Sequence, residues 1–470
     1  MHVRFIPLPC PGENMRRIRR SHRAIAVVTT LVLVAAACGN SKSQSKSANS
    51  TLPIATTTPA GVTTTTQDLS KFVPLPGVKG VTNKEIRTTA VISVTNLIGG
   101  QYKQLIDGVN AYFNMVNSKG GIYGRKLVNV NLRDDQGANN LQQTQDSLAQ
   151  DNAFANFGAT YISFAGASAL DAAHQPTFIW NINPEMAGHN NIFANEGALC
   201  FTCSGPTLPW LAKQIGAKKV AILGYAIPSS QECGDGTAAS FKQYDSGATV
   251  VYKDFTLPLD QPLASTVSTM KAKGVDFVLT CTDRNETQIL GKEMVKQGLK
   301  AVQELPNGYD ANFVKANAQY YEGDYVAPQY TGIEQQPQLP EITLFLSWLH
   351  KEHKSFVELS ADGWILADEL VTGLELAGPN FTQQKVIDAL NGVANFSDNG
   401  FIQPINWSTA HIDPETHPEV RQKVDCSNWL VIKNGKFVPV FAQPGKPWIC
   451  LPTSDNSLTQ VNHVTFAPQG

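Results

Sequence analysis

Short runs of β-branched and apolar residues alternate along the chain with longer segments in which apolar residues recur at helical spacing. The first pair is IRTTAVISVTN at 86–96, a predicted strand, and QYKQLIDGVNAYFNMVNSKG at 101–120, a predicted helix. In that helix Leu105, Val109 and Val116 fall on one face. The same alternation continues through KLVNVNLRDD, LQQTQDSLAQ, NAFANFGA, PTFIWNIN, WLAKQIGAKK, VAILGY, GTAASFKQYDSG, ATVVYKDF, STVSTMKAKG, VDFVLTC and ETQILGKEMVKQGL.

This order of strand, helix and strand predicts an α/β fold built from βαβ units, with parallel sheets, right-handed crossovers and helices on both faces. Roughly 390 residues lie beyond residue 80, which is more than one compact core usually holds, so we expect two doubly wound lobes. Open sheets of this kind bind ligands beyond the carboxyl ends of their strands. Two such edges that face each other form a ligand cleft.

The start of the chain has the pattern of an export signal. Residues 24–37 are uncharged, mostly apolar and too short to cross a bilayer as a stable helix. Five arginines lie between residues 16 and 23, and three alanines directly precede Cys38. The stretch resembles a bacterial lipobox, which implies removal of a signal peptide, residues 1–37, and lipidation of Cys38. The alternative is an ordinary secretory signal with Cys38 near the cut by chance.

Met15 directly precedes the arginines, so either Met1 or Met15 starts the chain. Residues 38–79 are dominated by Ser, Thr, Asn and Pro and offer almost nothing to bury. Such a segment cannot offset the entropy lost on ordering. We therefore expect a flexible tether between the lipid anchor and a globular body that begins near Val81.

Charge narrows the classes of partner. The chain has 37 basic and 39 acidic residues, and residues 1–37 hold six arginines and one glutamate. The mature chain therefore carries 31 basic and 38 acidic residues, a net charge of −7. A mildly acidic body argues against nucleic acid as a partner. No apolar stretch after residue 37 is long enough to cross a membrane.

Six cysteines follow Cys38, an even number that suggests disulfides in an exported protein. Six cysteines allow about 15 pairings, but Cys426 and Cys450 bracket a predicted hairpin, NWLVIKNGKFVPVF, and are paired first. Cys200 and Cys203 lie in CFTC, a spacing that also occurs in redox enzymes. Reactive pairs of that kind lie at the start of a helix, whereas GPTLP follows here, so a structural disulfide, local or to another cysteine, is favoured.

The stretch NMVNSKGGIYGRKLVNVNLRDDQ carries a motif of a known family. Asn117, the glycines at 120, 121 and 124, and Asp134–Asp135 fit the pattern N-x-x-GGI-x-GRKL followed by DD. Further segments match in the same order between about residues 86 and 440. These are KKVAILGY, YEGDYVAPQY, GWILADELVTGLELAG, QKVIDALNGV and FSDNG. The chain thus resembles leucine/isoleucine/valine-type periplasmic binding proteins.

That resemblance implies a non-enzymatic receptor, without a cofactor, that captures a small polar or amphipathic solute between two closing lobes. It implies delivery to the permease subunits of an ABC importer at the extracytoplasmic face of the bacterial cell membrane. The alternative is a receptor of the same fold that feeds a signalling partner. The implied lobes are 80–206 with 327–395, and 207–326 with 396–470. Arg125 in the GRKL turn is expected to be structural.

In the first lobe, the family grips a ligand carboxylate with small hydroxyl residues and backbone N–H groups after a strand. FGATYIS occupies that place, so Thr160 and Tyr161 are candidates; Thr160 could instead only cap the next helix. WNINPE brings Asn181 and Asn183 to the next strand end. Each asparagine could donate to a ligand or bond only the backbone of its turn.

In the second lobe, the corresponding strand ends are GYAIPSSQECGDG, TCTDRNE and ELPNGYD. They supply four further ligand candidates, each of which could also be ordinary surface polarity: Tyr225, Asp283, Asn307 and Tyr309. The resemblance also places Cys233 and Cys281 near this edge, where a disulfide between them would replace an aromatic residue of the family with a rigid wall.

One departure from the family bears on the ligand. Amino-acid binders carry an acidic residue in a GPEG-like context, which pairs with the ligand's ammonium group. Here the stretch is LPNG, with Asn307 at that place. A buried ammonium without a charged partner is costly. Either Asp283 takes over, or the ligand lacks an α-ammonium group, and the second interpretation is favoured.

Enzyme chemistry finds little support, since GxSxG, HExxH and P-loop motifs are absent from the sequence. His411 and His417 in HIDPETH could suggest a pair of metal ligands. Pro414 breaks any helix between them, and nearby ligands are not evident. We therefore expect no metal site.

Overall fold

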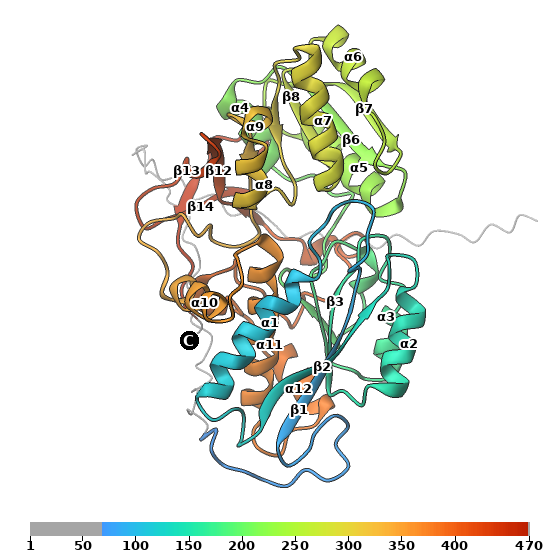
Figure 1. Ribbon diagram of the computed structural model, residues 1–470. Helices are drawn as coiled ribbons and strands as arrows, with labels where there is room; N and C mark the ends of the chain where they lie inside the picture. Colours follow the sequence, from blue (N-terminus) through green and yellow to red (C-terminus); the bar gives the residue numbers. More distant parts are fainter. Residues whose placement is uncertain (1–67, 469–470) are drawn as a thin grey trace, which may run out of the picture. The chain divides into compact units, whose positions relative to one another are not determined.

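The computed structural model describes residues 68–468 of the protein (Figure 1). The predicted signal peptide, Cys38 and residues 38–67 of the predicted tether lie outside the described residues. None of the helices within residues 68–468 is both long and apolar enough to cross a membrane.

The first sheet is wholly parallel, with the strand order β2-β1-β3-β4-β5. Its strands are β1 (Glu85–Ile92), β2 (Lys126–Asp134), β3 (Ala155–Ala159), β4 (Thr177–Ile179) and β5 (Ile192–Ala194). The helices around it are α1 (Gln104–Ser118), α2 (Asn140–Gln150), α3 (Ala167–Ala172), α10 (Pro340–Lys351), α11 (Glu358–Ala377) and α12 (Gln383–Asn391). Helices α2 and α3 cover one face, and α1, α11 and α12 cover the other (Figure 1).

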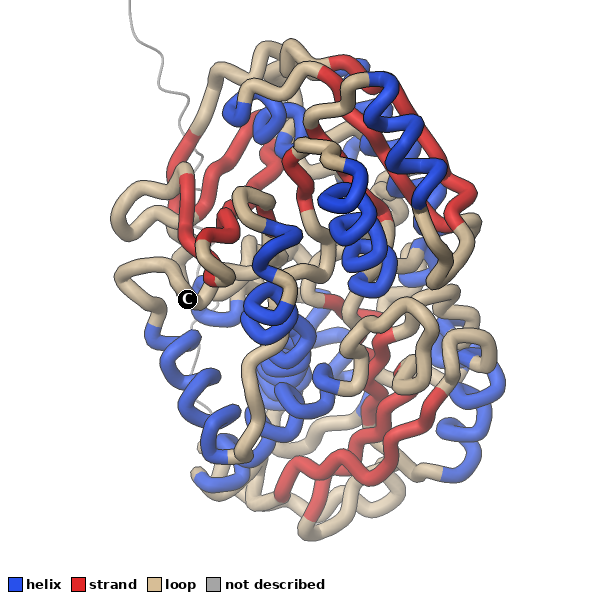
Figure 2. The backbone as a smooth tube through the Cα atoms, turned by 45° about the horizontal axis from the view of Figure 1, so that its top comes forward, coloured by secondary structure: helices blue, strands red, loops and turns tan. Residues whose placement is uncertain are grey.

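The second sheet has seven strands in the order β13-β12-β10-β9-β8-β6-β7. They are β6 (Lys219–Tyr225), β7 (Thr249–Leu257), β8 (Phe277–Cys281), β9 (Val302–Glu304), β10 (Tyr325–Val326), β12 (Trp429–Lys433) and β13 (Lys436–Val440). The accompanying helices are α4 (Thr207–Ile215), α5 (Pro228–Gln243), α6 (Ala264–Lys273), α7 (Arg284–Gln297), α8 (Ala311–Ala316) and α9 (Ala318–Tyr321). The tube view shows the strands of each sheet flanked by helices (Figure 2). Two doubly wound parallel sheets confirm the predicted α/β class.

The second sheet differs from a wholly parallel one at one edge. Strands β12 and β13 form an antiparallel hairpin that pairs with β10. The hairpin turns at Asn434–Gly435, both with positive φ (52° and 68°), which suits Asn-Gly because these residues tolerate that conformation. A third, antiparallel sheet has the order β11-β14-β15 (Val424–Ser427, Trp448–Pro452 and Asn462–Val464). Cys426 and Cys450 lie opposite each other in it and are disulfide-bonded.

The contacts of residues 396–411 indicate where the chain passes for the last time from the first lobe to the second. The Trp407 ring lies 5.0 Å from that of Phe193 in β5, and the His411 ring lies 5.1 Å from it. This segment therefore packs first on the sheet that contains β5. We propose that the last crossover into the second lobe follows His411, rather than residue 395 as the sequence suggested.

The GRKL turn is structural, as expected. Arg125 is fully buried and donates to the carbonyl oxygens of Val73 (2.6 Å), Thr82 (2.7 Å) and Tyr123 (3.3 Å). A Cβ on Gly121, which has φ 76°, would lie 2.0 Å from the Arg125 carbonyl oxygen. This turn therefore requires glycine, and the guanidinium has no free donor face for a ligand.

Helices α1 and α11 pack against each other along the first lobe (Figure 1). A Cβ on Gly108 would lie 1.9 Å from the Ser360 carbonyl oxygen. A Cβ on Gly363 would lie 1.8 Å from the Leu105 carbonyl oxygen. The crossing matters for function because α1 and α11 each begin at the cavity described below.

A pair of buried carboxyl groups, Asp368 of α11 and Asp398, lies in the first lobe. Asp398 is fully buried with both carboxyl oxygens unpaired, and the Tyr112 hydroxyl donates to Asp368. Burial and the neighbouring charge of Asp368 raise the pKa of the Asp398 carboxyl well above its usual value. Two carboxylates this close share a proton in preference to ionising together.

Replacing Asp398 with asparagine should therefore stabilise the protein at alkaline pH. Wild-type stability falls as the pH rises above about 4, because unfolding frees a carboxyl that the folded state holds neutral. The gain in Asp398→Asn should be small at pH 5 and clearly larger at pH 8. Urea unfolding at both pH values measures it, and an equal effect at both would contradict this account.

Candidate functional site

The strand ends of the first lobe bring the first four candidates close together. The Ser93 hydroxyl, directly after β1, donates to Asp135 (2.6 Å) and lies 3.3 Å from the Thr160 hydroxyl. The Asn183 amide donates to the Thr160 carbonyl oxygen (2.8 Å), and that of Asn181 donates to the Gly197 carbonyl oxygen (3.1 Å). These donors therefore hold the loops of their own lobe.

Tyr161 belongs to a set of aromatic rings at the same strand ends. Its ring stacks on that of Tyr102 at 6.1 Å, and Tyr102 lies 5.5 Å from the ring of Trp180. The hydroxyl of Tyr102 donates to the Asp283 carboxylate of the second lobe (2.8 Å). The aromatic set thus reaches the edge of the second sheet.

In the second lobe, Asp283 follows β8 and caps α7 by accepting from the backbone N–H of Arg284 (2.7 Å). The hydroxyl of Tyr225 accepts from the backbone N–H of Asp283 (3.1 Å). Asn307, at φ 52°, lines the same cavity as Asp283, and its side-chain amide lies close enough to act against the rise in the pKa of the Asp283 carboxyl that burial causes. Tyr309 lies apart, with its hydroxyl bonded to Glu334 and its ring 4.8 Å from that of Phe437.

A small cavity lies where the two sheets' strand ends meet. It has a volume of about 10 Å³, room for about one water molecule. Residues from both lobes line it: Gly100, Gln101, Asp283, Arg284, Asn307, Asp310, Val357, Glu358 and Leu359. Of the eight predicted ligand residues, Asp283 and Asn307 line this cavity. The Tyr225 hydroxyl contacts the backbone of Asp283, and the ring of Tyr102 separates Tyr161 from the Asp283 carboxylate.

Direct contacts between the lobes surround the cavity. Besides the bond from Tyr102 to Asp283, the Asn285 side-chain amide donates to the Leu97 carbonyl oxygen (2.8 Å). The backbone N–H of Asn285 donates to the Ile98 carbonyl oxygen (3.1 Å). A Cβ on Gly99 would lie 2.2 Å from the Asn285 side chain, so this loop needs its small residues. The structure therefore describes lobes in contact around the cavity.

Carboxyl groups dominate the charge around the cavity. Burial raises the pKa of Asp283, and it raises the pKa of Glu358, at the start of α11, to about 7. Burial and the charge of Glu358 raise the pKa of Glu304 to about 8. Arg284 also lines the cavity, but its guanidinium already pairs with Asp310 (3.4 Å).

Sequence reasoning missed Gly100, Gln101 and Glu358 as cavity residues. Gly100 and Gln101 follow β1, so the rule that ligands lie beyond strand ends could have included them. Glu358 gave no such signal, because it starts a helix that follows a crossover and only tertiary packing brings it to the strand ends.

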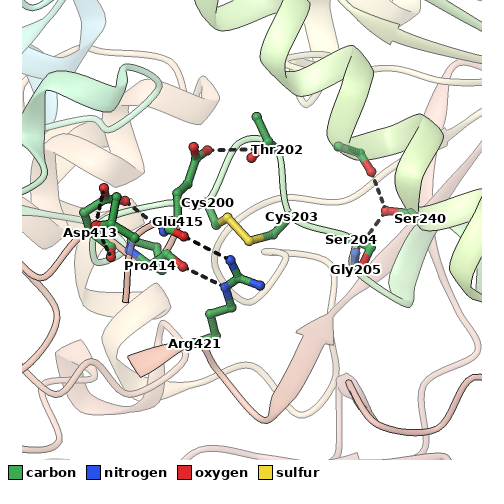
Figure 3. The surroundings of a disulfide bond; sticks show 12 residues. Cys200, Thr202, Cys203, Ser204, Gly205, Ser240, Asp413, Pro414, Glu415 and Arg421 are labelled. Carbon is green, nitrogen blue, oxygen red and sulfur yellow. Dashed lines mark hydrogen bonds between the residues drawn. A yellow bond between two sulfur atoms is a disulfide. The ribbon is translucent and has the colours of Figure 1, made fainter. Parts of the chain in front are cut away.

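Two further disulfides join cysteines between residues 200 and 281. Cys233 in α5 is bonded to Cys281 at the end of β8, two residues before Asp283, which is the pairing that the resemblance suggested. Cys200 and Cys203 are bonded to each other in the segment that leads from β5 to α4 (Figure 3). Glu415 accepts from the Thr202 backbone N–H (3.1 Å) beside this bond. The CFTC motif is thus a local disulfide.

His411 and His417 border the same hollow on the surface, but the two side chains differ in their surroundings. His411 is buried against Trp407 and Phe193, and burial lowers its pKa to about 4. His417 is exposed and lies 3.1 Å from Glu419. Between residues 68 and 468, no group of three His, Cys, Asp or Glu side chains is placed to hold a metal ion.

Solved structures with the same fold include a fatty acid ABC transporter substrate-binding protein from Thermomonospora curvata. The two are 20% identical, with a TM-score of 0.65 over 84% of this chain and 100% of that one. The branched-chain amino acid binding protein LivJ from Streptococcus pneumoniae, in complex with isoleucine, is 14% identical with a TM-score of 0.63, covering 82% and 100%. A solute-binding protein from R. palustris in complex with benzoate is 16% identical with a TM-score of 0.62, covering 82% and 98%.

Among curated proteins, no sequence matches this chain. The model of the family described as periplasmic binding protein matches residues 93–418, which is more than half of the chain. That stretch includes the strand ends, the aromatic rings and the cavity described above. The chain belongs to the periplasmic binding protein family, as its resemblance to the leucine/isoleucine/valine type indicated.

Proposed function

We propose that this protein is the solute receptor of an ABC importer. It binds a small polar or amphipathic solute, such as an amino acid, an amide or a carboxylic acid, between its lobes and delivers it to the permease subunits. The observation that carries the proposal is that residues after strands of both sheets line one cavity. With the lobes in contact it has room for about one water molecule, so the lobes must part to admit a solute. Binding and closure need no catalytic group, cofactor, metal or nucleic acid.

The proposal includes the site of action. Cys38 carries a lipid that holds the protein at the extracytoplasmic face of the cell membrane, and residues 38–79 link it to the lobes. A tether raises the effective concentration of the receptor at the permease. Replacement of Cys38 with serine should release the protein from membranes into the medium, which fractionation of cells would detect.

The side chains of the cavity must decide the ligand, because the fold alone does not. Of the three solved structures, one is named for the transport of fatty acids, one holds isoleucine and one holds benzoate. These solutes differ in charge and shape. We propose that Asp283 and Asn307 contact the solute together with Gln101 and Glu358. Tyr161 and Tyr225 support them from behind, and Thr160, Asn181, Asn183 and Tyr309 hold the surrounding loops.

A thermal-shift screen of the mature protein tests the proposal. The library should contain amino acids, amides, amines, and short-chain, fatty and aromatic acids, at pH 6 and pH 8. A solute that binds only the folded state raises the free energy of unfolding by mass action, by about 2.7 kcal/mol at a solute concentration of a hundred times its Kd. The melting temperature rises with it. We expect one chemical class to stand out and to bind with a stoichiometry of one by calorimetry. A library without any binder would contradict the proposed capture of solutes.

The same screen tests the role of Asn307. Leucine, isoleucine and valine should shift the melting temperature little, because Asn307 cannot offset an ammonium group as the family's acidic residue does. Strong shifts by all three would show that another group has taken over that role.

A further inference from the structure

The carboxyl groups near the cavity continue as a row into the interior. Glu358 is followed by Asp362, one turn further along α11, and then by the half-buried Glu196, two residues after the end of β5. Burial, then the charges of Glu358 and Glu196, raise the pKa of Asp362 well above its usual value. Burial, then the charge of Asp425, raises the pKa of Glu196 to about 7. These causes show that each carboxyl group lies within electrostatic reach of the next.

This row lacks compensating charge. Asp362 is fully buried, and one of its carboxyl oxygens has no hydrogen-bond partner, while the other accepts from Asn195 (3.1 Å). Glu196 accepts from the Gln329 amide (2.9 Å), which is neutral. Arg284 is the cation at the cavity wall, and Asp310 already neutralises it. Buried carboxylates without cations are costly, and a bound cation would relieve that cost.

An aromatic ring, that of Tyr102, lies against two residues of the cavity wall, Gly100 and Asp283. Tyr102 joins the aromatic set, with Tyr161 and Trp180, to the Asp283 carboxylate through its hydroxyl. Ring faces attract cations by about 0.5–2 kcal/mol, more when water is excluded. Carboxylates beside aromatic rings therefore form surroundings that suit an ammonium or guanidinium group better than a carboxylate group.

We infer that the solute is net cationic, a small amine or guanidinium compound whose charged group lies between Asp283 and Glu358, with Asp362 one helical turn further along α11. This inference rests on the proposed function and names the class of its substrate. The cavity wall holds the carboxyl groups of Asp283, Asp310 and Glu358 against the single guanidinium of Arg284, and a zwitterionic amino acid would leave this excess of negative charge unbalanced. The favoured expectation from the sequence, a ligand without an α-ammonium group, remains compatible, because the positive charge can lie elsewhere in the solute.

An alternative occupant would exploit the same groups differently. At pH 6, a protonated Glu358 could donate a hydrogen bond to an anionic solute, since its pKa of about 7 keeps it largely neutral there. The two cases differ in the sign of their pH dependence. A cation binds the ionised carboxylates, so its affinity rises with pH, whereas an anion needs the protonated form and its affinity falls.

Calorimetry on matched compounds separates these cases. The first set keeps four carbons and varies charge: 1,4-diaminobutane, 4-aminobutanoate and butanedioate. The second set is arginine and citrulline, which differ in the guanidinium charge, and the third is the best binder of the thermal-shift library. We expect the best binder to be net cationic, and its affinity to rise about tenfold or more between pH 5.5 and pH 8 with release of protons.

Two conservative variants test the named residues. Glu358→Gln and Asp283→Asn should each weaken binding of the cationic solute by about 10- to 100-fold at pH 8. Glu419→Gln, an exposed glutamate that contacts His417, is the matched control and should leave affinity unchanged. Circular dichroism confirms that each variant is folded.

The outcomes are distinguishable. If the best binder is zwitterionic or anionic, or if its affinity falls with rising pH, the inference is overturned while solute capture stands. Unchanged affinity in both Glu358→Gln and Asp283→Asn also overturns it. If no compound of any charge binds, the proposed function itself fails.

Discussion

The Glu358→Gln variant should be more stable than the wild type at pH 8 when no solute is present. Glu358 is buried beside Asp283, and burial raises its pKa from 4.5 to about 7. A carboxyl group with a raised pKa weakens the folded state progressively as the pH rises from about 4.5 to 7, because unfolding lets it ionise in water. The full gap corresponds to about 3 kcal/mol, and we expect about 1–3 kcal/mol because the side chain is partly open to the cavity.

Urea unfolding of both proteins at pH 5, 6, 7 and 8 measures this effect. The stabilities should nearly coincide at pH 5 and separate up to about pH 7. The amide oxygen of glutamine can still accept from the Tyr309 backbone N–H, which lies 3.4 Å from Glu358, so packing should change little. Glu419→Gln, at the surface, should unfold like the wild type at every pH. A gain that does not depend on pH would mean that Glu358 acts through packing and not through charge.

The Gly363→Ala variant should lose about 3 kcal/mol of stability or more. The new Cβ would lie 1.8 Å from the carbonyl oxygen and 2.8 Å from the carbonyl carbon of Leu105. Both atoms are backbone, so α1 and α11 must move apart, and the side chains packed between them lose contact. Overpacking of this kind usually costs about 1–3 kcal/mol. The cost of separating two buried helices should lie at or above the upper end of that range.

Gly373→Ala on the same helix is the matched control. Its Cβ would meet the side chains of Leu390 (2.8 Å) and Val386 (2.9 Å), which can shift more readily than the backbone of a neighbouring helix. Alanine also favours a helix by about 1 kcal/mol over glycine, so this variant should stay within about 1 kcal/mol of the wild type. Urea unfolding compares the two. A loss in Gly363→Ala no larger than in Gly373→Ala would contradict the account of the crossing.

The crossing of α1 and α11 also affects the cavity. Helix α1 begins three residues after Gln101, and α11 begins with Glu358. The contact at Gly108 and Gly363 therefore fixes the spacing of two elements that line the cavity. Gly363→Ala should therefore weaken binding of the solute, although Gly363 itself does not line the cavity.

Much of the fold could be predicted from periodicity. Predicted strands and helices such as 86–96, 101–120 and VAILGY became β1, α1 and β6, because each matches the period of its element. The hairpin around Asn434–Gly435 was also predictable, since this pair favours the tight turn. Its antiparallel pairing at the edge of a parallel sheet was not, because partner choice depends on tertiary packing.

The site was less predictable. Residues directly after strands, such as Asp283 and Asn307, could be anticipated from topology and lie at the cavity. The same rule also selected Tyr309, whose ring packs against Phe437, so position after a strand does not distinguish a ligand contact from a core side chain. Glu358 and Asp362 come from one helix that no strand-end rule covers.

The carboxyl groups at the site lower the stability of the solute-free protein, and their role in binding would explain why they are present. Asp283, Glu358 and Asp362 each have a raised pKa, so the solute-free protein is weaker at neutral pH than an uncharged site would make it. Natural proteins often keep such destabilising groups where they bind ligands. Under the inference above, a cationic solute offsets this cost on binding.

The most direct test of the central claim is small-angle X-ray scattering of the mature protein with and without the saturating solute from the screen. The claim is that strand ends of two lobes face one another and close on a small molecule. Contacts between the lobes, such as that from Asn285 to Leu97, should then be more populated with solute bound than without it. We predict a smaller radius of gyration with solute than without it. An unchanged radius under saturating solute would contradict closure of the lobes.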